Sequence, residues 1–194
     1  MTLPDDAQAR KAASLIGIAG HKQVGKSTLA DFLSRTLGIP QDSFAAPIRR
    51  AVADILGISP EVLELRKETP VEWLGGKTPR EMMQTMGTEW GRTMVHHELW
   101  IRSLIHRKAG DGVIIGDVRF PNEAHAILTN GGIVLRVTRP GHQSSDPHSS
   151  EDPLPDRLVS HEIENDGPPA DMFQAALSCI QSGGPLNLPG DDAE

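Results

Sequence analysis

The sequence has little cysteine and few aromatic residues. Of its 194 residues one is cysteine and none is tyrosine, and phenylalanine and tryptophan together make up 4%. Because a single cysteine, Cys179, can form neither an intrachain disulfide nor a cysteine zinc site, the chain suits a reducing compartment. We therefore expect a cytoplasmic protein.

An excess of positive charge and long hydrophobic runs are also missing. The formal net charge is −7, which argues against a sequence-independent DNA or RNA binder, since such proteins need a basic surface. No stretch approaches the roughly 20 apolar residues of a membrane span, and the first residues lack the pattern of a signal peptide. We expect neither a nucleic-acid polymer nor a membrane as partner.

Hydrophobic residues make up 38% of the chain and charged residues 23%, which is ordinary for a globular domain. The length fits one α/β domain with a well-developed core. We place this domain at residues 13–182. Residues 1–12 and 183–194 are polar and rich in Pro, Gly and Asp, and we expect them to be flexible tails.

The residues at 20–28, GHKQVGKST, fit the phosphate-binding P-loop pattern. An apolar run at 14–19 predicts a buried strand before them, and residues 27–37 predict a helix after them. In this arrangement backbone N–H groups of the loop and the positive end of the helix dipole surround the phosphates of a nucleotide. The sequence therefore predicts a nucleoside-triphosphate site.

Within the P-loop each residue type has a physical role. Gly20 and Gly25 permit the turn, and Lys26 places an ammonium against the β- and γ-phosphates. The Ser27 hydroxyl is expected to bind Mg²⁺, while Thr28 packs or caps the helix. The expected ATP-binding residues of the loop are Gly20, Lys22, Val24, Gly25, Lys26, Ser27 and Thr28.

Strand and helix patterns alternate along the rest of the chain. Further strands are predicted at 42–46, 112–119, 132–138 and 161–165. Helices are predicted at 47–56, 60–67, 79–86, from about 89 to 107, 121–130 and 171–181, and residues 141–160 read as a long loop or lid. Five short strands with covering helices predict an α/β fold with a doubly wound parallel sheet and helices on both faces.

A carboxylate and two arginines follow predicted strands. Asp117 ends the apolar run of its strand and is expected to support Mg²⁺, directly or through water; the alternative is an aspartate that caps the next helix. Arg119 and Arg139 follow strands at the carboxyl edge of the sheet, where open α/β folds bind ligands. Arg49, Arg80 and Arg92 are further candidates, because phosphoryl transfer between two anions needs several cations.

Several stretches together are similar to a known family. They are the P-loop, residues 44–49 (FAAPIR), 79–92 (PREMMQTMGTEWGR), 117–124 (DVRFPNEA), 139–141 (RPG), 148–151 (HSSE) and 165–167 (NDG). The chain resembles the deoxynucleoside monophosphate kinases of tailed bacteriophages. The resemblance implies a three-layer P-loop NTPase fold with strand order 2-3-1-4-5, ATP and Mg²⁺ as cofactors, a deoxynucleoside 5′-monophosphate as acceptor and, for a phage protein, the host cytoplasm.

The resemblance also implies which residues bind each substrate. The acceptor region is expected at about 45–107. Its contacts are Phe44, Ala45, Pro47, Arg49, Arg80, Gln84, Gly87, Thr88 and Arg92, with Phe44 stacking on the base, Gln84 and Thr88 reading its edge, and Arg80 and Arg92 holding the phosphate. The lid, about 141–160, closes over ATP, with Arg139 at its base, and Asn165 and Gly167 lie near the adenine. Lys26, Arg119 and Arg139 are the expected catalytic residues.

Two other functions fit the same residues. One is a P-loop kinase of another acceptor, such as dephospho-coenzyme A, a nucleoside or phosphomevalonate; the other is a nucleotide-binding module that regulates a partner. The sequence leaves open which bases are accepted, the preference for deoxyribose over ribose, and the oligomeric state, a homodimer included.

Overall fold

The computed structural model describes residues 15–108, 112–141 and 154–182. The chain divides into two compact units, which we treat separately. The sheet unit comprises the described residues up to Asp42 and from Lys108 onward, and the helical unit is Ser43–Arg107. The bounds of the helical unit lie close to those of the predicted acceptor region. The predicted tails and residues 142–153 of the predicted lid lie outside the described residues.

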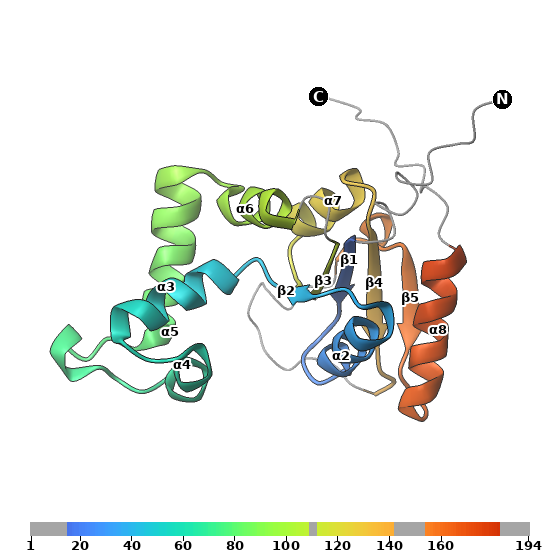
Figure 1. The fold of residues 1–194 in the computed structure, drawn as a ribbon, viewed down its shortest axis with the longest axis horizontal. Helices are drawn as coiled ribbons and strands as arrows, with labels where there is room; N and C mark the ends of the chain where they lie inside the picture. Colours follow the sequence, from blue (N-terminus) through green and yellow to red (C-terminus); the bar gives the residue numbers. More distant parts are fainter. Residues whose placement is uncertain (1–14, 109–111, 142–153, 183–194) are drawn as a thin grey trace. The chain divides into compact units, whose positions relative to one another are not determined.

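The sheet unit is built on five parallel strands in the order β2-β3-β1-β4-β5, the order that the family resemblance implies (Figure 1). The strands are β1 (Leu15–Ala19), β2 (Gln41–Asp42), β3 (Val113–Val118), β4 (Ile133–Thr138) and β5 (His161–Glu164). β1, β3 and β4 are almost continuously apolar, as strands buried on both faces must be. Since all strands are parallel, their carboxyl ends meet at one edge of the sheet.

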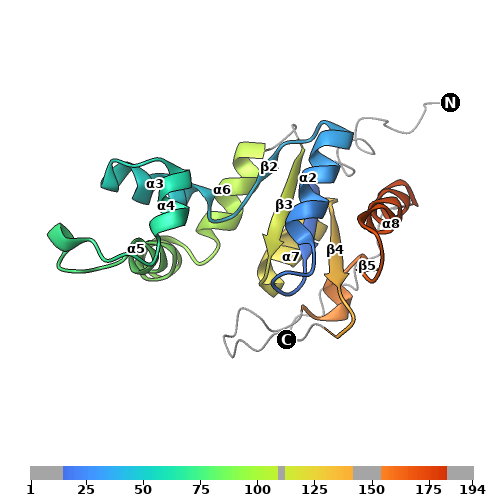
Figure 2. The same ribbon diagram turned by 90° about the horizontal axis from the view of Figure 1, so that it is seen from below.

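Helices cover both faces of this sheet, as Figures 1 and 2 show. On one face α2 (Lys26–Leu37) and α8 (Pro169–Ser182) pack Leu29, Leu33 and Met172 into a core with residues of all the strands except β2. On the other face α7 (Pro121–Thr129) lies so close that a Cβ atom on Gly17 would be 2.6 Å from Ile127 Cδ1. The fold is therefore the predicted three-layer α/β arrangement.

The described end of the predicted lid, residues 154–160, packs within the sheet unit. It contains the short 3₁₀ helix η4 (Asp156–Leu158), and Leu154 and Leu158 are each 6% exposed. Arg136 of β4 donates a hydrogen bond to Asp156 Oδ1 at 2.7 Å and another to the Leu154 carbonyl oxygen. Apolar burial and an arginine from the sheet thus anchor this segment.

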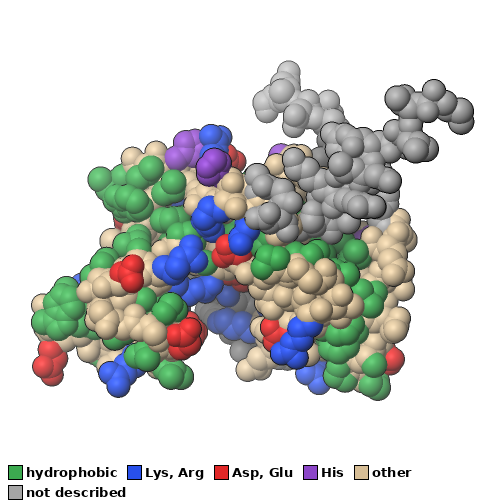
Figure 3. Space-filling view, in the orientation of Figure 1, with side chains coloured by type: hydrophobic (Ala, Val, Ile, Leu, Met, Phe, Trp, Pro, Cys, Tyr) green, Lys and Arg blue, Asp and Glu red, His purple; other side chains and the backbone are tan. Residues whose placement is uncertain are grey.

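The helical unit contains α3 (Ala46–Leu56), α4 (Pro60–Arg66), η1 (Glu72–Leu74), α5 (Pro79–Thr85), η2 (Met86–Val95) and most of α6 (Leu99–Lys108). Its small core combines Val52, Ala53 and Leu63 with three methionines, Met82, Met83 and Met86. Other apolar side chains remain on its surface, which Figure 3 shows in green. The most exposed are Ile55, Leu65, Trp73, Trp90, Met94 and Val95.

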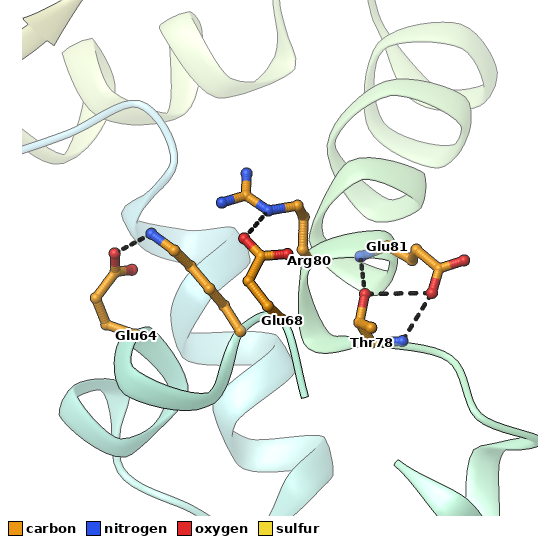
Figure 4. A network of polar contacts seen from close by, with 6 residues as sticks. Glu64, Glu68, Thr78, Arg80 and Glu81 are labelled. Carbon is orange, nitrogen blue, oxygen red and sulfur yellow. Dashed lines mark hydrogen bonds and ion pairs between the residues drawn. The ribbon is translucent and has the colours of Figure 1, made fainter. Parts of the chain in front are cut away.

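Capping explains where α5 begins. Thr78 Oγ1 accepts a hydrogen bond from the Glu81 N–H at 3.2 Å, and the Glu81 carboxylate accepts one from the Thr78 N–H at 2.8 Å (Figure 4). Pro79 occupies the first helical turn, where its missing N–H costs nothing. The backbone N–H of Thr78 and then the Lys77 ammonium hold the pKa of Glu81 below its ordinary value.

Two sequence predictions about elements were wrong. The strand predicted at 42–46 ends at Asp42, because β2 pairs with β3 over two residues only and Ser43 then opens the turn into α3. The helix predicted from about 89 to 107 is instead a ten-residue π-helix, η2, followed by a break at His96 and then α6. The local pattern of apolar residues does not distinguish a π-helix, whose backbone hydrogen bonds join residues i and i+5, from an α-helix, whose bonds join residues i and i+4.

Candidate functional site

The loop between β1 and α2 has the backbone geometry of a phosphate cradle. Gly20 has φ +136°, and a Cβ atom there would lie 2.2 Å from the Val137 carbonyl oxygen. Gly25 has φ +109°, and a Cβ atom there would lie 2.7 Å from the Asn165 amide nitrogen. Both positions therefore require glycine, for backbone conformation and for space.

Lys26 spans this loop. Its ammonium donates hydrogen bonds to the carbonyl oxygens of Gly20 at 2.7 Å and His21 at 2.6 Å. The N-cap of α2 is Gly25, which has no side chain to cap the helix, and the first turn carries no acidic residue. A cation across the loop and an uncapped positive helix end suit an anionic ligand, so these residues fit the triphosphate of a nucleotide.

The remaining loop residues of the predicted ATP site lie around this cradle. Lys22, Ser27 and Thr28 are exposed, whereas Val24 is buried in the core below the loop. Ser27 is the second residue of α2, so that its hydroxyl is at the N-terminal end of the helix.

Asp117 lies in an irregularity of the sheet. Gly17 pairs with Ile115 and Ala19 with Val118, so that two residues of β3, Gly116 and Asp117, stand opposite one residue of β1. Such a bulge changes the direction of side chains and is common beside active sites. One carboxylate oxygen of Asp117, Oδ1, is buried. A Cβ atom on Gly116 would lie 3.5 Å from Ala30, one helical turn after Ser27, which brings this part of β3 against α2.

The segment after Asp117 is fixed by a buried carboxylate. Glu123 of α7 is 4% exposed, and its Oε2 accepts hydrogen bonds from the N–H groups of Arg119 at 3.0 Å and Phe120 at 3.2 Å. The Arg119 side chain is exposed at the carboxyl end of β3. Glu123 thus orders the backbone that carries Arg119.

Arg139 and residues 165–167 complete this edge of the sheet. Arg139 is exposed directly after β4 and Asn165 directly follows β5. The Asn165 side chain donates a hydrogen bond to the Val24 carbonyl oxygen at 2.8 Å, and Gly167 is exposed. The sheet unit therefore brings Lys26, Ser27, Asp117, Arg119, Arg139 and Asn165 to the carboxyl ends of β1, β3, β4 and β5.

The helical unit contains the predicted acceptor residues, and two of them line one cavity. This cavity has a volume of about 830 Å³, and Pro47 and Gln84 are part of its wall. The rest of its lining is Ala51, Lys77, Glu81, Met82, Thr85, Met86, Glu89, Trp90 and Trp100. A volume of this size is typical of pockets for small organic ligands.

Trp90 and Trp100 form one wall of the cavity. Their rings lie 6.2 Å apart at an interplanar angle of 45°. Trp100 is 8% exposed and donates its indole N–H to the Gly87 carbonyl oxygen at 2.8 Å, whereas Trp90 is 48% exposed. The predicted acceptor set contains neither, since core packing is the commoner use of tryptophan. The four-residue spacing of Met82, Met86 and Trp90 could have placed Trp90 on one helix face with the two methionines.

Glycine brings η2 close to Trp100. A Cβ atom on Gly91 would lie 2.5 Å from Trp100 Cζ2 and 2.8 Å from Nε1. Among the predicted acceptor residues of η2, Thr88 is exposed and Arg92 half-buried. π-Helices are rare, occur mostly as single-turn bulges within α-helices, and are frequently found at functional sites.

The other predicted acceptor residues form hydrogen bonds within the helical unit, are buried, or cap a helix. Arg80 donates to the Glu68 carboxylate, and Figure 4 shows its two terminal nitrogens pointing away from Glu68. Arg49 donates to the Ser43 hydroxyl, and Phe44 is 4% exposed. Ala45 is the N-cap residue of α3.

Residues 15–108, 112–141 and 154–182 provide neither a clustered metal site nor a membrane-spanning helix. They contain no group of three or more His, Cys, Asp or Glu side chains that could hold a metal ion. None of their helices is long and apolar enough to cross a membrane. The absence of a clustered metal site among these residues is compatible with Mg²⁺, which keeps several water ligands and binds through one or two protein oxygens, such as those of Ser27 and Asp117, together with substrate phosphates.

Comparison with known proteins gives consistent results. A family model described as deoxynucleotide monophosphate kinase matches residues 75–175, slightly more than half of the chain. The "Putative deoxynucleotide monophosphate kinase" of Acanthamoeba polyphaga mimivirus is 33% identical over 192 residues, covering 89% of this chain and 99% of the relative. The deoxynucleoside-5′-monophosphate kinase of Escherichia phage T5 is 34% identical over 99 residues, covering 45% of this chain and 39% of the relative.

Among solved structures, the shikimate kinase of Aquifex aeolicus matches with a TM-score of 0.46 at 17% identity, covering 86% of this chain and 95% of that one. The family model and the nearly full-length match to the mimiviral relative are the decisive findings. This chain belongs to the deoxynucleotide monophosphate kinase family.

Proposed function

We propose that this member of the family transfers the γ-phosphoryl group of ATP to the 5′-phosphate of a deoxynucleoside monophosphate. The observation that carries the proposal is the glycine cradle between β1 and α2, crossed by the Lys26 ammonium. The alternative acceptors named above would need the same donor site, but family membership favours a deoxynucleotide.

For the donor, the proposed contacts are the loop N–H groups and Lys26 for the phosphates, with Arg119 and Arg139 as further cations at the same sheet edge. Ser27 and Asp117 would hold Mg²⁺, Asp117 directly or through water. When bound, Mg²⁺ neutralises charge on the β- and γ-phosphate oxygens. The Lys26 ammonium, which now donates hydrogen bonds to the carbonyl oxygens of Gly20 and His21, would exchange these acceptors for phosphate oxygens.

For the acceptor, we propose that the nucleoside binds in the cavity of the helical unit. Trp90 is about half exposed there, so its ring has surface on which a base can stack. Gln84 has both an amide donor and an acceptor for hydrogen bonds to the edge of a base. Phe44, which the sequence suggested as the stacking residue, is 4% exposed and offers little surface.

Arg80 and Arg92 are the proposed ligands of the acceptor phosphate. A guanidinium binds a phosphate with two parallel hydrogen bonds, and the terminal nitrogens of Arg80 point away from Glu68 (Figure 4). An acceptor phosphate is already an anion at neutral pH, so no general base is required. Catalysis then consists of alignment and charge stabilisation by Lys26 and the arginines.

The test is a panel of acceptors assayed with MgATP, comprising the four common deoxynucleoside monophosphates and their ribose counterparts. We expect nucleoside diphosphate to form from at least one deoxynucleotide, and replacing Trp90 by alanine to raise the KM for that acceptor while the KM for ATP stays constant. If no deoxynucleotide is phosphorylated although MgATP binds, the proposed acceptor is wrong. Unchanged acceptor KM in the Trp90→Ala variant would refute the role of the cavity.

A further inference from the structure

The side chain of Asn165 links the last strand of the sheet to the phosphate loop. Its amide nitrogen donates a hydrogen bond of 2.8 Å to the carbonyl oxygen of Val24, across 141 residues of sequence. The backbone N–H of Asn165 donates to the Thr138 carbonyl oxygen, also at 2.8 Å. Asn165 is therefore held by the sheet and in turn holds the loop.

This hydrogen bond determines the direction of a neighbouring N–H group. The Val24 carbonyl and the Gly25 N–H belong to the same planar trans peptide and point in opposite directions. When the carbonyl points toward Asn165, the Gly25 N–H must point away from it. Backbone N–H groups of this loop are the groups that bind phosphate.

We infer that Asn165 is a positioning residue for the donor phosphates, which acts by orienting the peptide between Val24 and Gly25. The inference rests on the proposed use of ATP and gives Asn165 a role different from the adenine contact that the sequence suggested. The close approach to Gly25 supports it, since a Cβ atom there would lie 2.7 Å from the Asn165 amide nitrogen. Asn165 thus fills the space behind the loop as well as bonding to it.

The binding of tripolyphosphate distinguishes positioning of the phosphate loop from contact with the adenine, because tripolyphosphate has the phosphates of ATP without the base. We propose to titrate the full chain and its Asn165→Ala and Asn165→Asp variants with MgATP and with magnesium tripolyphosphate by calorimetry. The Asp side chain has the shape of Asn but cannot donate to the Val24 carbonyl when ionised. We expect both ligands to lose affinity by the same factor, about tenfold for Asn165→Ala, the upper range for one hydrogen bond.

Asn130 provides the matched control. Its amide nitrogen also donates to a carbonyl oxygen, that of Ala126, at 2.8 Å, but at the exposed end of α7. The Asn130→Ala variant should bind both ligands like the wild type. The ratio of ATP to GTP affinity should also stay unchanged in the Asn165 variants, since the inference involves no contact with the base.

Two results would overturn the inference. If the Asn165 variants lose affinity for ATP but keep it for tripolyphosphate, and their preference between ATP and GTP changes, Asn165 binds the base. If neither affinity falls, the hydrogen bond does not position the loop. Should Asn165→Ala fail to fold, the isosteric Asn165→Asp variant decides by the same comparison. The titrations need no acceptor, so a failure of deoxynucleotide phosphorylation is a separate outcome.

Discussion

The contact between Gly91 and Trp100 allows a direct test of the packing behind the proposed acceptor cavity. In the Gly91→Ala variant the new methyl group would lie 2.5 Å from Trp100 Cζ2, far inside van der Waals contact. Since Trp100 is 8% exposed, its ring has little room to move. The ring must shift, η2 must move away from α6, or both, and the hydrogen bond from Trp100 to the Gly87 carbonyl is then lost or weakened.

The expected change in the free energy of unfolding is the sum of two costs and one gain. Overpacking a buried site costs about 1–3 kcal/mol, and losing the indole hydrogen bond costs about 1 kcal/mol more. Replacing glycine by alanine inside a helix returns about 1 kcal/mol. The free energy of unfolding of the helical unit should therefore fall by about 1–3 kcal/mol.

Gly87→Ala in the same helix is the matched control. There the nearest atom to the new Cβ is the tip of the flexible Ile48 side chain at 3.2 Å, which can move aside. The gain in helix propensity and the tight contact nearly cancel, so we expect a change within about 1 kcal/mol of zero.

Urea unfolding followed by tryptophan fluorescence is the appropriate assay, because the chain has three tryptophans and all of them, Trp73, Trp90 and Trp100, lie in the helical unit. The signal thus reports on this unit alone. The Gly91→Ala variant should also show a red-shifted native emission as Trp100 becomes exposed. If it is as stable as Gly87→Ala and its emission is unchanged, the packing argument for the cavity wall is wrong.

Further substitutions test individual roles in the two sites. Lys26→Ala should lower kcat by at least about a hundredfold without changing the melting temperature, as measured in a coupled ADP assay, since one charge-stabilising donor to the transition state is lost. Asp117→Asn should raise the Mg²⁺ concentration needed for half-maximal activity in a Mg²⁺ titration, while the native circular dichroism spectrum is kept. Thr78→Ala should lower the free energy of unfolding by about 1 kcal/mol through loss of the α5 cap, measured by urea unfolding. The folded-state pKa of Glu81 is lowered, so the stability that this carboxylate contributes is present above its ordinary pKa and is lost as the pH falls through the lowered value. The unfolding curves of the wild type and the Glu81→Gln variant should therefore converge as the pH falls below the ordinary pKa of glutamate.

The sequence predicted best what depends on contiguous residues. The P-loop, its strand and its helix were identified from residues 14–37. The phosphate-binding groups of such a loop belong to the backbone, so that the pattern specifies residue types at few positions, the two glycines and Lys26 among them. The start of α5 was equally local, since Thr78 and Pro79 specify the cap and the first turn. Most strand and helix bounds agree with the structure to within two residues.

Features that depend on distant residues were not predicted. The bulge that contains Asp117 appears only when β3 pairs with β1, and the bond between Asn165 and Val24 joins opposite ends of the domain sequence. Within the π-helix, Gly91 meets Trp100, nine residues later, and the periodicity of the sequence does not reveal such a contact. Tertiary packing decided all three, and local sequence carries no signal for it.

The proposed donor and acceptor sites therefore differ in how well they tolerate substitutions. In the proposed donor site the directions of the backbone groups depend on Gly20, Gly25 and Asn165, so nearly any substitution at these residues should impair ATP binding. The cavity proposed for the acceptor instead presents exposed side chains, such as Gln84 and Glu89, on a wall that buried packing against Trp100 holds in place. Replacing such exposed groups alters contacts with the ligand at little cost in stability, because surface substitutions usually change the free energy of unfolding by no more than about 0.5 kcal/mol. Substitutions at Gln84 and Glu89 should therefore change which bases are accepted before they change whether the helical unit folds.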